Sequence, residues 1–322
     1  MGGEMAGGEE VRVWRKAIPE GRDRVQSRGL VWVVGALLVW MSYLAVERTY
    51  YYLLGDDADL IQALIPIGIS VVFVVLVLAL RAATKMGGAF GGIICFVMVE
   101  WTRPWGAWTL RSGLIPLALL FVLTFLSTRA GRRRKAEAGL AEGRKGRSAA
   151  QVIANLSVAA LVVSPLGQAI AMGSTGPCCG TGYSQHWVIP VTRLMCLAAL
   201  VEATADTVSS EIGQVFGGRP VMLLSLKRVE VGTDGAVSLL GSGAGILAGA
   251  MVAVVGMWGL RLSAKEACIA LVAGVCGLFF DSLLGATLER RGWLGNDLVN
   301  FSSTVLAAGV AVLIYRVVVF GR

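Results

Sequence analysis

Charged residues are scarce in this sequence: they make up only 16% of 322 residues, whereas 56% are hydrophobic. The mean hydropathy is +0.71. These values exclude a disordered protein, a nucleic-acid-binding protein and an ordinary soluble domain. The formal net charge is +8, but the segment 129–147 alone holds eight Lys or Arg residues against two Glu. Such a segment is typical of a cytoplasmic loop in a membrane protein and not of a DNA-binding face.

Residue types that commonly perform catalysis or bind metals are also few. The single histidine, His186, lies in a loop predicted on the outer side of the membrane, so we do not expect it to act as a catalytic base. The six cysteines show no CxxC pair, which argues against a metal or disulfide scaffold. GxxxxGK[ST], the protein-kinase motifs, HExxH and GxSxG are absent as well. Any bound nucleotide must therefore be held by membrane helices and their loops.

Long apolar runs are abundant, and a membrane-spanning helix needs about 20 mostly apolar residues. Two of the runs are short or interrupted by Arg193 and Glu202, so we expect them to be tilted, broken or re-entrant; these are 86–99 and 188–205. The stronger runs are 30–46, 60–80, 112–128, 149–172, 236–260, 267–288 and 298–319. The sequence therefore predicts an all-α, polytopic membrane bundle of about nine transmembrane helices.

The predicted domain organisation is a polar N-terminal arm, residues 1–29, and one transmembrane domain, residues 30–322, with the basic loop at 129–147. With the N-terminus inside, 21 of the 29 Lys and Arg residues fall on the cytoplasmic side, in agreement with the positive-inside rule. The arm has no signal-peptide pattern, and no transit peptide is visible. We therefore expect an integral protein of a bacterial plasma membrane.

Small residues recur at helical spacing in two places. A GxxxGxxxG pattern occupies 241–249, and two overlapping GxxxG pairs lie within 87–92. One interpretation is close contact between neighbouring helices. The alternative is a backbone that lines a substrate groove.

A first group of polar residues leads from the basic loop into a span, in the sequence GRKGRSAAQVIAN. It contains Arg144 and Arg147, and in a helix Arg147, Gln151 and Asn155 share one face. Cationic and amide groups in this arrangement suit a phosphate or a polar head group. The alternative is a positively charged helix start that only sets topology.

A second group lies in EATADTVSSEIG, where Glu202 and Asp206 are one helical turn apart and Thr207, Ser210 and Glu211 lie nearby. Adjacent carboxylates repel each other unless a cation or a proton lies between them, and hydroxyls complete an oxygen-rich site. Mg²⁺ holding a nucleotide is the economical explanation. A polar helix end with solvated carboxylates is the alternative.

A glycine-bounded turn follows, just ahead of the apolar run 236–260. It comprises Gly232, Thr233, Asp234 and Gly235, and Lys227 precedes it. Backbone N–H groups at a turn that opens a helix, together with a lysine, can bind phosphate, although Gly and Asp also form ordinary turns.

A third group lies in FFDSLLGATLERRGWLGNDLVNF. Asp281 interrupts an apolar run and shares a predicted helix face with Glu289, and Asn296 and Asn300 open the last span. A carboxylate within a span is costly, so it marks either a function or a pairing with a buried Arg or Lys. All three groups fall at the predicted cytoplasmic ends of their helices, where nucleoside triphosphates are found.

At these residues the sequence resembles the integral membrane family called domain of unknown function 92, which includes transmembrane protein nineteen and plant phytyl-phosphate kinases. The resemblance runs from about Lys85 to the C-terminus. It rests on five motifs in order: RSAAQVIAN, ATADTVSSEIG, GTDGAVSLLG, DSLLGATLE and NDLVNF. The second and third motifs are distantly similar to CTP-dependent polyprenol kinases, and the fourth to phosphatidate cytidylyltransferases.

The resemblance implies phosphoryl transfer from a nucleoside triphosphate, with CTP as one candidate, to an isoprenoid lipid phosphate. Asp206, Glu211 and Asp281 would then be catalytic and hold Mg²⁺. Phosphates, nucleotide or acceptor would be bound by Arg144, Arg147, Gln151, Asn155, Thr207, Ser210, Lys227, Gly232, Thr233, Asp234, Gly235, Asn296 and Asn300. The other expected partner is the lipid bilayer, nucleic acid is not expected, and a homodimer stays open.

Two alternatives remain at this stage. A CTP-dependent cytidylyltransferase acting on a lipid phosphate would release pyrophosphate, whereas a kinase releases a nucleoside diphosphate. A transporter or scaffold would use the intramembrane acids to relay ions. Against transport, the sequence shows no inverted repeat.

Overall fold

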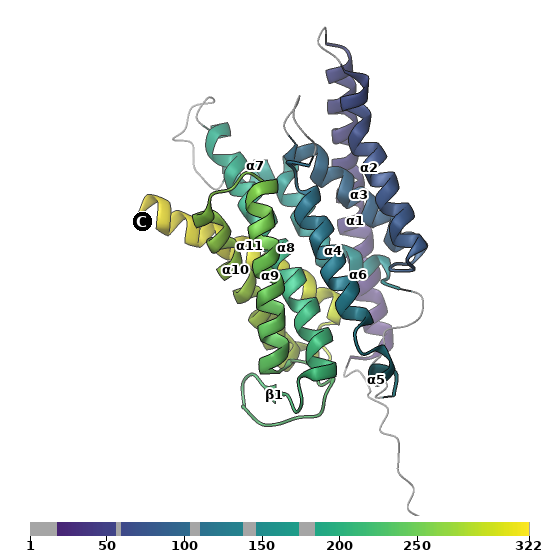
Figure 1. The fold of residues 1–322 in the computed structure, drawn as a ribbon, viewed down its shortest axis with the longest axis vertical. Helices are drawn as coiled ribbons and strands as arrows, with labels where there is room; N and C mark the ends of the chain where they lie inside the picture. Colours follow the sequence, from purple (N-terminus) through teal and green to yellow (C-terminus); the bar gives the residue numbers. More distant parts are fainter. Residues whose placement is uncertain (1–17, 56–58, 104–109, 138–145, 174–183, 322) are drawn as a thin grey trace, which may run out of the picture.

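The protein is a bundle of long helices in the computed structural model, which describes residues 18–55, 59–103, 110–137, 146–173 and 184–321 (Figure 1). The helices are α1 (Glu20–Leu53), α2 (Leu60–Ala79), α3 (Lys85–Thr102), α4 (Leu114–Arg129), α5 (Arg132–Glu137), α6 (Ala149–Val163), α7 (Pro165–Gly173), α8 (Ser184–Phe216), α9 (Leu239–Gly259), α10 (Ala264–Leu284) and α11 (Asn296–Phe320). A π-helical turn, Gly285–Glu289, follows α10 directly. Two short antiparallel strands, β1 (Val221–Met222) and β2 (Ala236–Val237), lie at one end of the bundle.

The predicted all-α membrane architecture is confirmed, although the count of nine spans is not. Every predicted span overlaps a helix, or two helices in the case of 149–172. Within the described ranges, six helices are long and apolar enough to cross a membrane: α1, α2, α8, α9, α10 with its π turn, and α11. The bent pair α6–α7 makes a seventh if it is one span, and α4 is apolar but only 16 residues long.

The broken helix path lies in a run that the sequence marked as one of the stronger spans. We expected the run 188–205, interrupted by Arg193 and Glu202, to be tilted, broken or re-entrant, and it lies within α8, one continuous helix of 33 residues. The predicted span 149–172 is the broken one, with a bend of 64° between α6 and α7. Pro165 opens α7 and cannot donate a backbone hydrogen bond, and it holds Ser164 in an extended conformation (ψ 169°) that ends α6.

The most buried of these candidate spans is α8, which packs against α4, α6, α9, α10 and α11. Its stretch from Leu194 to Val201 is almost fully buried. Small residues on α9 permit the close approach, because a Cβ added at Gly241 would lie 2.6 Å from the Ser209 carbonyl oxygen. The GxxxGxxxG pattern therefore serves helix contact.

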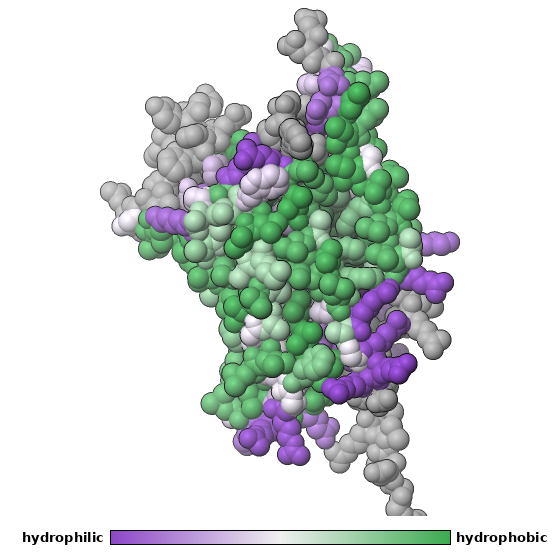
Figure 2. Space-filling model, viewed as in Figure 1, coloured by the Kyte–Doolittle hydropathy of each residue, from purple (hydrophilic) through white to green (hydrophobic). Residues whose placement is uncertain are grey.

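Apolar side chains cover the outer surface of the bundle, as a bilayer requires. Trp32 is 78% exposed and Val72 is 67% exposed. Figure 2 shows this hydrophobic surface over the middle of one face, with hydrophilic side chains gathered toward the ends. Lipid tails would cover such a surface.

Part of the predicted polar arm is helical, because α1 begins at Glu20, ten residues before the predicted span. Three side chains of this extension bind the segment that leads into α11. Arg22 donates to the Gly292 carbonyl (2.8 Å), the Gln26 amide donates to the Trp293 carbonyl (2.7 Å), and Ser27 donates to Asp297 (2.6 Å). The start of α1 is therefore attached to the start of α11.

Candidate functional site

A polar cavity of about 460 Å³ lies at the end of the bundle where β1 and β2 are found. It is formed by α6, α8, the segment 231–238, the end of α10 and the start of α11. Most of the predicted site residues line it: Arg147, Gln151, Asn155, Asp206, Thr207, Ser210, Glu211, Gly232, Thr233, Asp234, Gly235, Asp281, Asn296 and Asn300. The fold therefore brings the three polar groups of the sequence to one place.

We expected Arg147 to lie on a helix. It reaches the cavity instead from an extended segment just before α6. Its N–H donates to the Ala82 carbonyl (2.9 Å), and its carbonyl accepts from the Thr84 N–H (3.0 Å). Gly146 makes this pairing feasible, because its φ is +74° and an added Cβ would lie 2.7 Å from three backbone atoms of residues 81–83. The guanidinium then donates to the Thr207 hydroxyl (3.4 Å) beside Asp206.

The first turn of α6 adds amide groups to the cavity. Ser148 and Gln151 form a capping box, in which the Gln151 side-chain oxygen accepts from the Ser148 N–H (2.8 Å). That oxygen is therefore engaged in starting the helix. One turn later Asn155, only 5% exposed, donates to the Gln151 carbonyl (2.9 Å).

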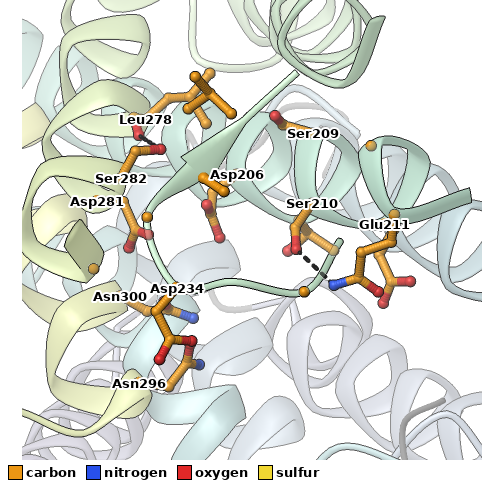
Figure 3. Close-up of a pocket in the computed structure, with 18 of the residues that line it drawn as sticks. Asp206, Ser209, Ser210, Glu211, Asp234, Leu278, Asp281, Ser282, Asn296 and Asn300 are labelled. Atoms are coloured by element: carbon orange, nitrogen blue, oxygen red, sulfur yellow. Dashed lines mark hydrogen bonds between the residues drawn. The ribbon is translucent and has the colours of Figure 1, made fainter. Parts of the chain in front are cut away.

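Two carboxylates face the cavity from neighbouring helices, Asp206 from α8 and Asp281 from α10 (Figure 3). They lie close enough to repel each other electrostatically, and Arg147 is close enough to Asp206 to attract it. Glu202 and Glu289 also lie near Asp281. Buried carboxyl groups this close to one another favour a bound cation or a shared proton.

A hydrogen-bonded group holds Asp281 in place. Ser303 donates to Asp281 Oδ2 (3.2 Å). The Asn300 amide is oriented so that its nitrogen faces hydrogen-bond acceptors and its oxygen faces a donor. Its nitrogen donates to Asp281 Oδ2 (3.2 Å), and its oxygen accepts from Asn155 Nδ2 (3.2 Å). Asn155 of α6, Asn300 of α11 and Asp281 of α10 thus form one chain of contacts.

Glu211 has a different partner from the one predicted. It forms an ion pair with Lys135 of α5, and both residues are buried. Figure 3 shows Glu211 well apart from Asp206 and Asp281. Five residues along a helix correspond to a rotation of about 140° from Asp206, so the two side chains leave α8 in different directions. The pair attaches the basic segment to α8.

The turn 232–235 packs its backbone against the end of α10. Gly235 has a φ of +73°, and an added Cβ would lie 2.5 Å from the Ser282 carbonyl oxygen. The opposing Gly285 begins the π turn, and its added Cβ would lie 2.7 Å from the Gly235 nitrogen. π turns of this kind are frequent at functional sites.

The local structure of this turn corrects one expectation and shows how Thr233 is held. The residues after it form strand β2, and α9 begins at Leu239 with Ser238 as its N-cap, so the turn does not open a helix directly. The Thr233 N–H and hydroxyl both donate to the Glu230 carbonyl (3.3 and 2.8 Å). Thr233 therefore stabilises the turn itself.

Two predicted phosphate-binding residues are not placed at the cavity by the described part of the chain. Lys227 is exposed and lies outside the lining of the cavity, whereas Arg144 falls outside the described residues. Five further polar residues line the cavity although the sequence gave them no binding role: Ser209, Gln214, Ser238, Ser282 and Glu289. Ser209 and Glu289 follow Asp206 and Asp281 at helical spacing, which was a usable signal. Gln214, Ser238 and Ser282 gave none.

The donor set fits a hard divalent cation that also binds substrate phosphates. Within the described part of the chain, no three His, Cys, Asp or Glu side chains form a metal-binding group, so the predicted Asp206–Glu211–Asp281 triad does not assemble. Mg²⁺ commonly uses one or two carboxylates plus waters and phosphate oxygens. Asp206 and Asp281 match that smaller set.

A family model described as Integral membrane protein DUF92 matches residues 68–308, well over half of the chain. The chain belongs to the DUF92 family of integral membrane proteins. All the residues that line the cavity fall within the DUF92 match, whereas α1 lies outside it.

Several DUF92 relatives are similar to this chain. Protein VTE6, chloroplastic, from Arabidopsis thaliana is 31% identical over 218 residues, which is 67% of this chain and 62% of VTE6. An uncharacterized membrane protein of Synechocystis, sll0875, is 32% identical over 65% of this chain and 75% of its own length. Protein PGR from Arabidopsis thaliana is 30% identical over 55% of this chain and 65% of PGR. This chain therefore spans less than two thirds of VTE6, and no solved structure matches it significantly.

Proposed function

We propose that this protein is a membrane-embedded kinase that transfers a phosphoryl group from a nucleoside triphosphate to a prenyl monophosphate of the phytyl or geranylgeranyl class. The observation behind this proposal is the polar cavity, in which Asp206, Asp281 and Arg147 converge at one end of an apolar bundle. A polar reaction on a lipid needs this combination of charged groups and adjoining apolar surface. The family resemblance of the sequence motifs points to the same chemistry.

The reaction places few demands on acid–base groups. An oxygen of the prenyl monophosphate attacks the γ-phosphorus, and the bond from that phosphorus to the β–γ bridging oxygen breaks. The products are a prenyl diphosphate and a nucleoside diphosphate. A phosphate monoester has a second pKa of about 6, so its attacking oxygen is already anionic at pH 7. Positioning and charge stabilisation therefore dominate the catalysis.

The cavity residues divide these tasks. Asp206 and Asp281 would hold Mg²⁺, and the bound ion would neutralise charge on the transferring phosphoryl group. Asn300 and Ser303 keep Asp281 oriented through their hydrogen bonds. Arg147 supplies a planar, permanently charged donor for phosphate oxygens. The turn 232–235 lies across the cavity and would flank the nucleotide phosphates.

The proposed location is a bacterial plasma membrane, with the cavity open to the cytoplasm. The segment 129–137, rich in Lys and Arg, is attached through Lys135 to the same end of α8 that forms the cavity. The positive-inside rule then places this end on the cytoplasmic side, where nucleoside triphosphates are available.

The test uses purified protein with Mg²⁺, each of CTP, ATP and GTP labelled at the γ- or α-phosphate, and geranylgeranyl monophosphate. We expect γ-label in a prenyl diphosphate, with at least a 10²-fold loss of rate in Asp206→Asn and Asp281→Asn, typical for removal of transition-state charge stabilisation. Asp59→Asn, at the distant N-cap of α2, is the matched control. Transfer of α-label would show a cytidylyltransferase instead, and full activity in both variants would contradict the proposed site.

A further inference from the structure

A second, smaller cavity adjoins the polar one on the side of α2, α3 and α4. Its volume is about 60 Å³, and it is enclosed by α2, α3, α4, α6 and α8. Most of its wall consists of apolar side chains and glycines, among them Phe73, Phe121 and Leu120. Thr124 of α4 adds a hydroxyl to the wall, but this hydroxyl donates to backbone carbonyls of its own helix (2.9 and 3.3 Å).

The two cavities share a boundary. Arg147 and Asn155 belong to the lining of both. On α8, Ala203 lines the apolar cavity and Thr207, one turn further on, lines the polar one and accepts a hydrogen bond from Arg147 (3.4 Å). A molecule with a phosphate head and an apolar tail could therefore place its head at Arg147 and its first carbons behind it.

The apolar cavity adjoins a seam between α2 and α4 on the lipid-facing surface. Phe73 of α2 contacts Phe121 of α4 edge to face, with ring centroids 5.5 Å apart. Neighbouring side chains on both helices are exposed, with Val72 at 67% and Val122 at 46%. The ring contact closes this seam, so a tail that leaves the cavity here would part the two rings and then enter the hydrocarbon of the bilayer.

We propose that this apolar cavity binds the head-proximal carbons of the isoprenoid acceptor, and that the remainder of its tail leaves by parting the contact between Phe73 and Phe121. The inference rests on the proposed kinase function for the identity of the lipid. The cavity holds about the volume of two water molecules, so it fits only the carbons next to the phosphate. The rest of the tail needs the bilayer, which lies beyond the contact between Phe73 and Phe121.

Gly91 offers a direct way to fill this space. A Cβ at this position would lie 3.5 Å from Phe73 and 4.0 Å from Val152, which are ordinary contacts, so Gly91→Ala is sterically accommodated. Gly91→Val would add two methyl groups to this Cβ, at a position that lines the cavity. Gly68 is the matched control, because it lies on the exposed side of α2 and an added Cβ meets no atom within 4 Å.

The first experiment measures kinetics with geranylgeranyl monophosphate. In Gly91→Val we expect the KM for this acceptor to rise at least tenfold, with the KM for the nucleotide unchanged, and a smaller rise in Gly91→Ala. Gly68→Val should behave as wild type. An unchanged acceptor KM in both Gly91 variants, with wild-type transfer intact, overturns the inference and leaves the kinase function standing.

The second experiment does not depend on catalysis. A geranylgeranyl monophosphate analogue with a diazirine near the phosphate is photo-crosslinked to the protein in nanodiscs, and the labelled peptides are mapped by mass spectrometry. We expect labels on α2 and α4 around Phe73 and Phe121 that Gly91→Val suppresses and Gly68→Val does not. Labels there without any phosphoryl transfer support the lipid site and contradict the kinase function, whereas labels confined to other helices overturn the lipid site.

Discussion

At the scale of single residues, the position of Arg147 depends on the residue before it. The backbone pairing with Ala82 and Thr84 fixes Arg147 at the cavity, and that pairing requires a positive φ and no Cβ at position 146. An alanine there would be strained and would collide with residues 81–83. The guanidinium would then move away from Thr207 and Asp206.

We expect Gly146→Ala to lower the rate of phosphoryl transfer at least tenfold and to lower the thermal midpoint of unfolding. The change affects the cavity only through the placement of Arg147. Gly309→Ala is the control, because no atom lies within 4 Å of its added Cβ. Kinetics and thermal unfolding of both variants check the prediction, which fails if Gly146→Ala matches Gly309→Ala in both.

Lys135 and Glu211 form a buried ion pair whose contribution to stability can be measured. Removing one partner leaves an uncompensated buried charge, so Lys135→Met and Glu211→Met should each destabilise the protein by about 3–5 kcal/mol. The double variant should recover most of that loss, because an apolar pair replaces the ion pair. Denaturation of all four proteins in the same detergent measures the coupling, and additive losses would show that the contact is not important for stability.

At the scale of secondary-structure elements, the extension of α1 supports the start of α11, which contributes Asn296 and Asn300 to the cavity. Gln26 bridges two groups of the connecting segment: it donates to the Trp293 carbonyl and accepts from the Gly295 N–H, both at 2.7 Å. Gly295 is the N-cap of α11. The helix α1 lies outside the DUF92 match, yet it helps to position Asn296 and Asn300, which lie within that match.

We expect Gln26→Ala to increase hydrogen exchange at the amides of residues 293–300 without unfolding the bundle. The substitution removes two hydrogen bonds, each with a net contribution of about 1 kcal/mol. Arg24→Ala, exposed on the same helix, should leave this exchange unchanged. Equal exchange in the two variants would mean that α11 begins independently of α1.

At the scale of the whole molecule, the bundle has two different ends. The polar cavity, the strands and the segment rich in Lys and Arg occupy one end, and the α9–α10 connection lies at the other. In that connection, burial lowers the pKa of Arg261, which donates to the Thr102 carbonyl (2.9 Å). The asymmetry makes orientation a testable property.

We expect a cysteine at Leu224, beside β1, to react with a membrane-impermeant maleimide only from the cytoplasmic side. The position is 61% exposed, and the proposed orientation places it inside. Lys265→Cys, exposed at the start of α10, should react only from outside. Labelling of intact cells and inverted vesicles, in a variant without native cysteines, distinguishes the two orientations; the reverse pattern would place the cavity outside.

A second prediction at this scale concerns the metal. A nucleoside triphosphate should raise the thermal midpoint of unfolding in the presence of Mg²⁺ and not with excess EDTA, because the ligand stabilises the folded state by about 2.7 kcal/mol at 100 times its Kd. Asp206→Asn should abolish the shift, and Asp59→Asn should keep it. An equal shift with EDTA would show that nucleotide binding does not use the carboxylates with a metal.

The sequence alone determined the membrane architecture and most of the residues around the cavity. Apolar runs and polar interruptions are local features, so they were sufficient to locate the helices and to single out Asp206, Asp281 and Asn300. Carboxylates and amides within apolar segments are costly, and because of this cost they are rare enough to stand out among apolar neighbours.

Only the tertiary structure decided which of these residues meet. Glu211 pairs with Lys135 and Lys227 stays outside the cavity, and neither outcome follows from helical spacing, because each depends on contacts between distant segments. Pro165 was a local signal for the end of α6 at Ser164, but the continuous run of apolar residues 149–172 favoured a single span. The apolar cavity behind Arg147 is likewise a product of packing, since five helices contribute to its walls and no single segment of the sequence describes it.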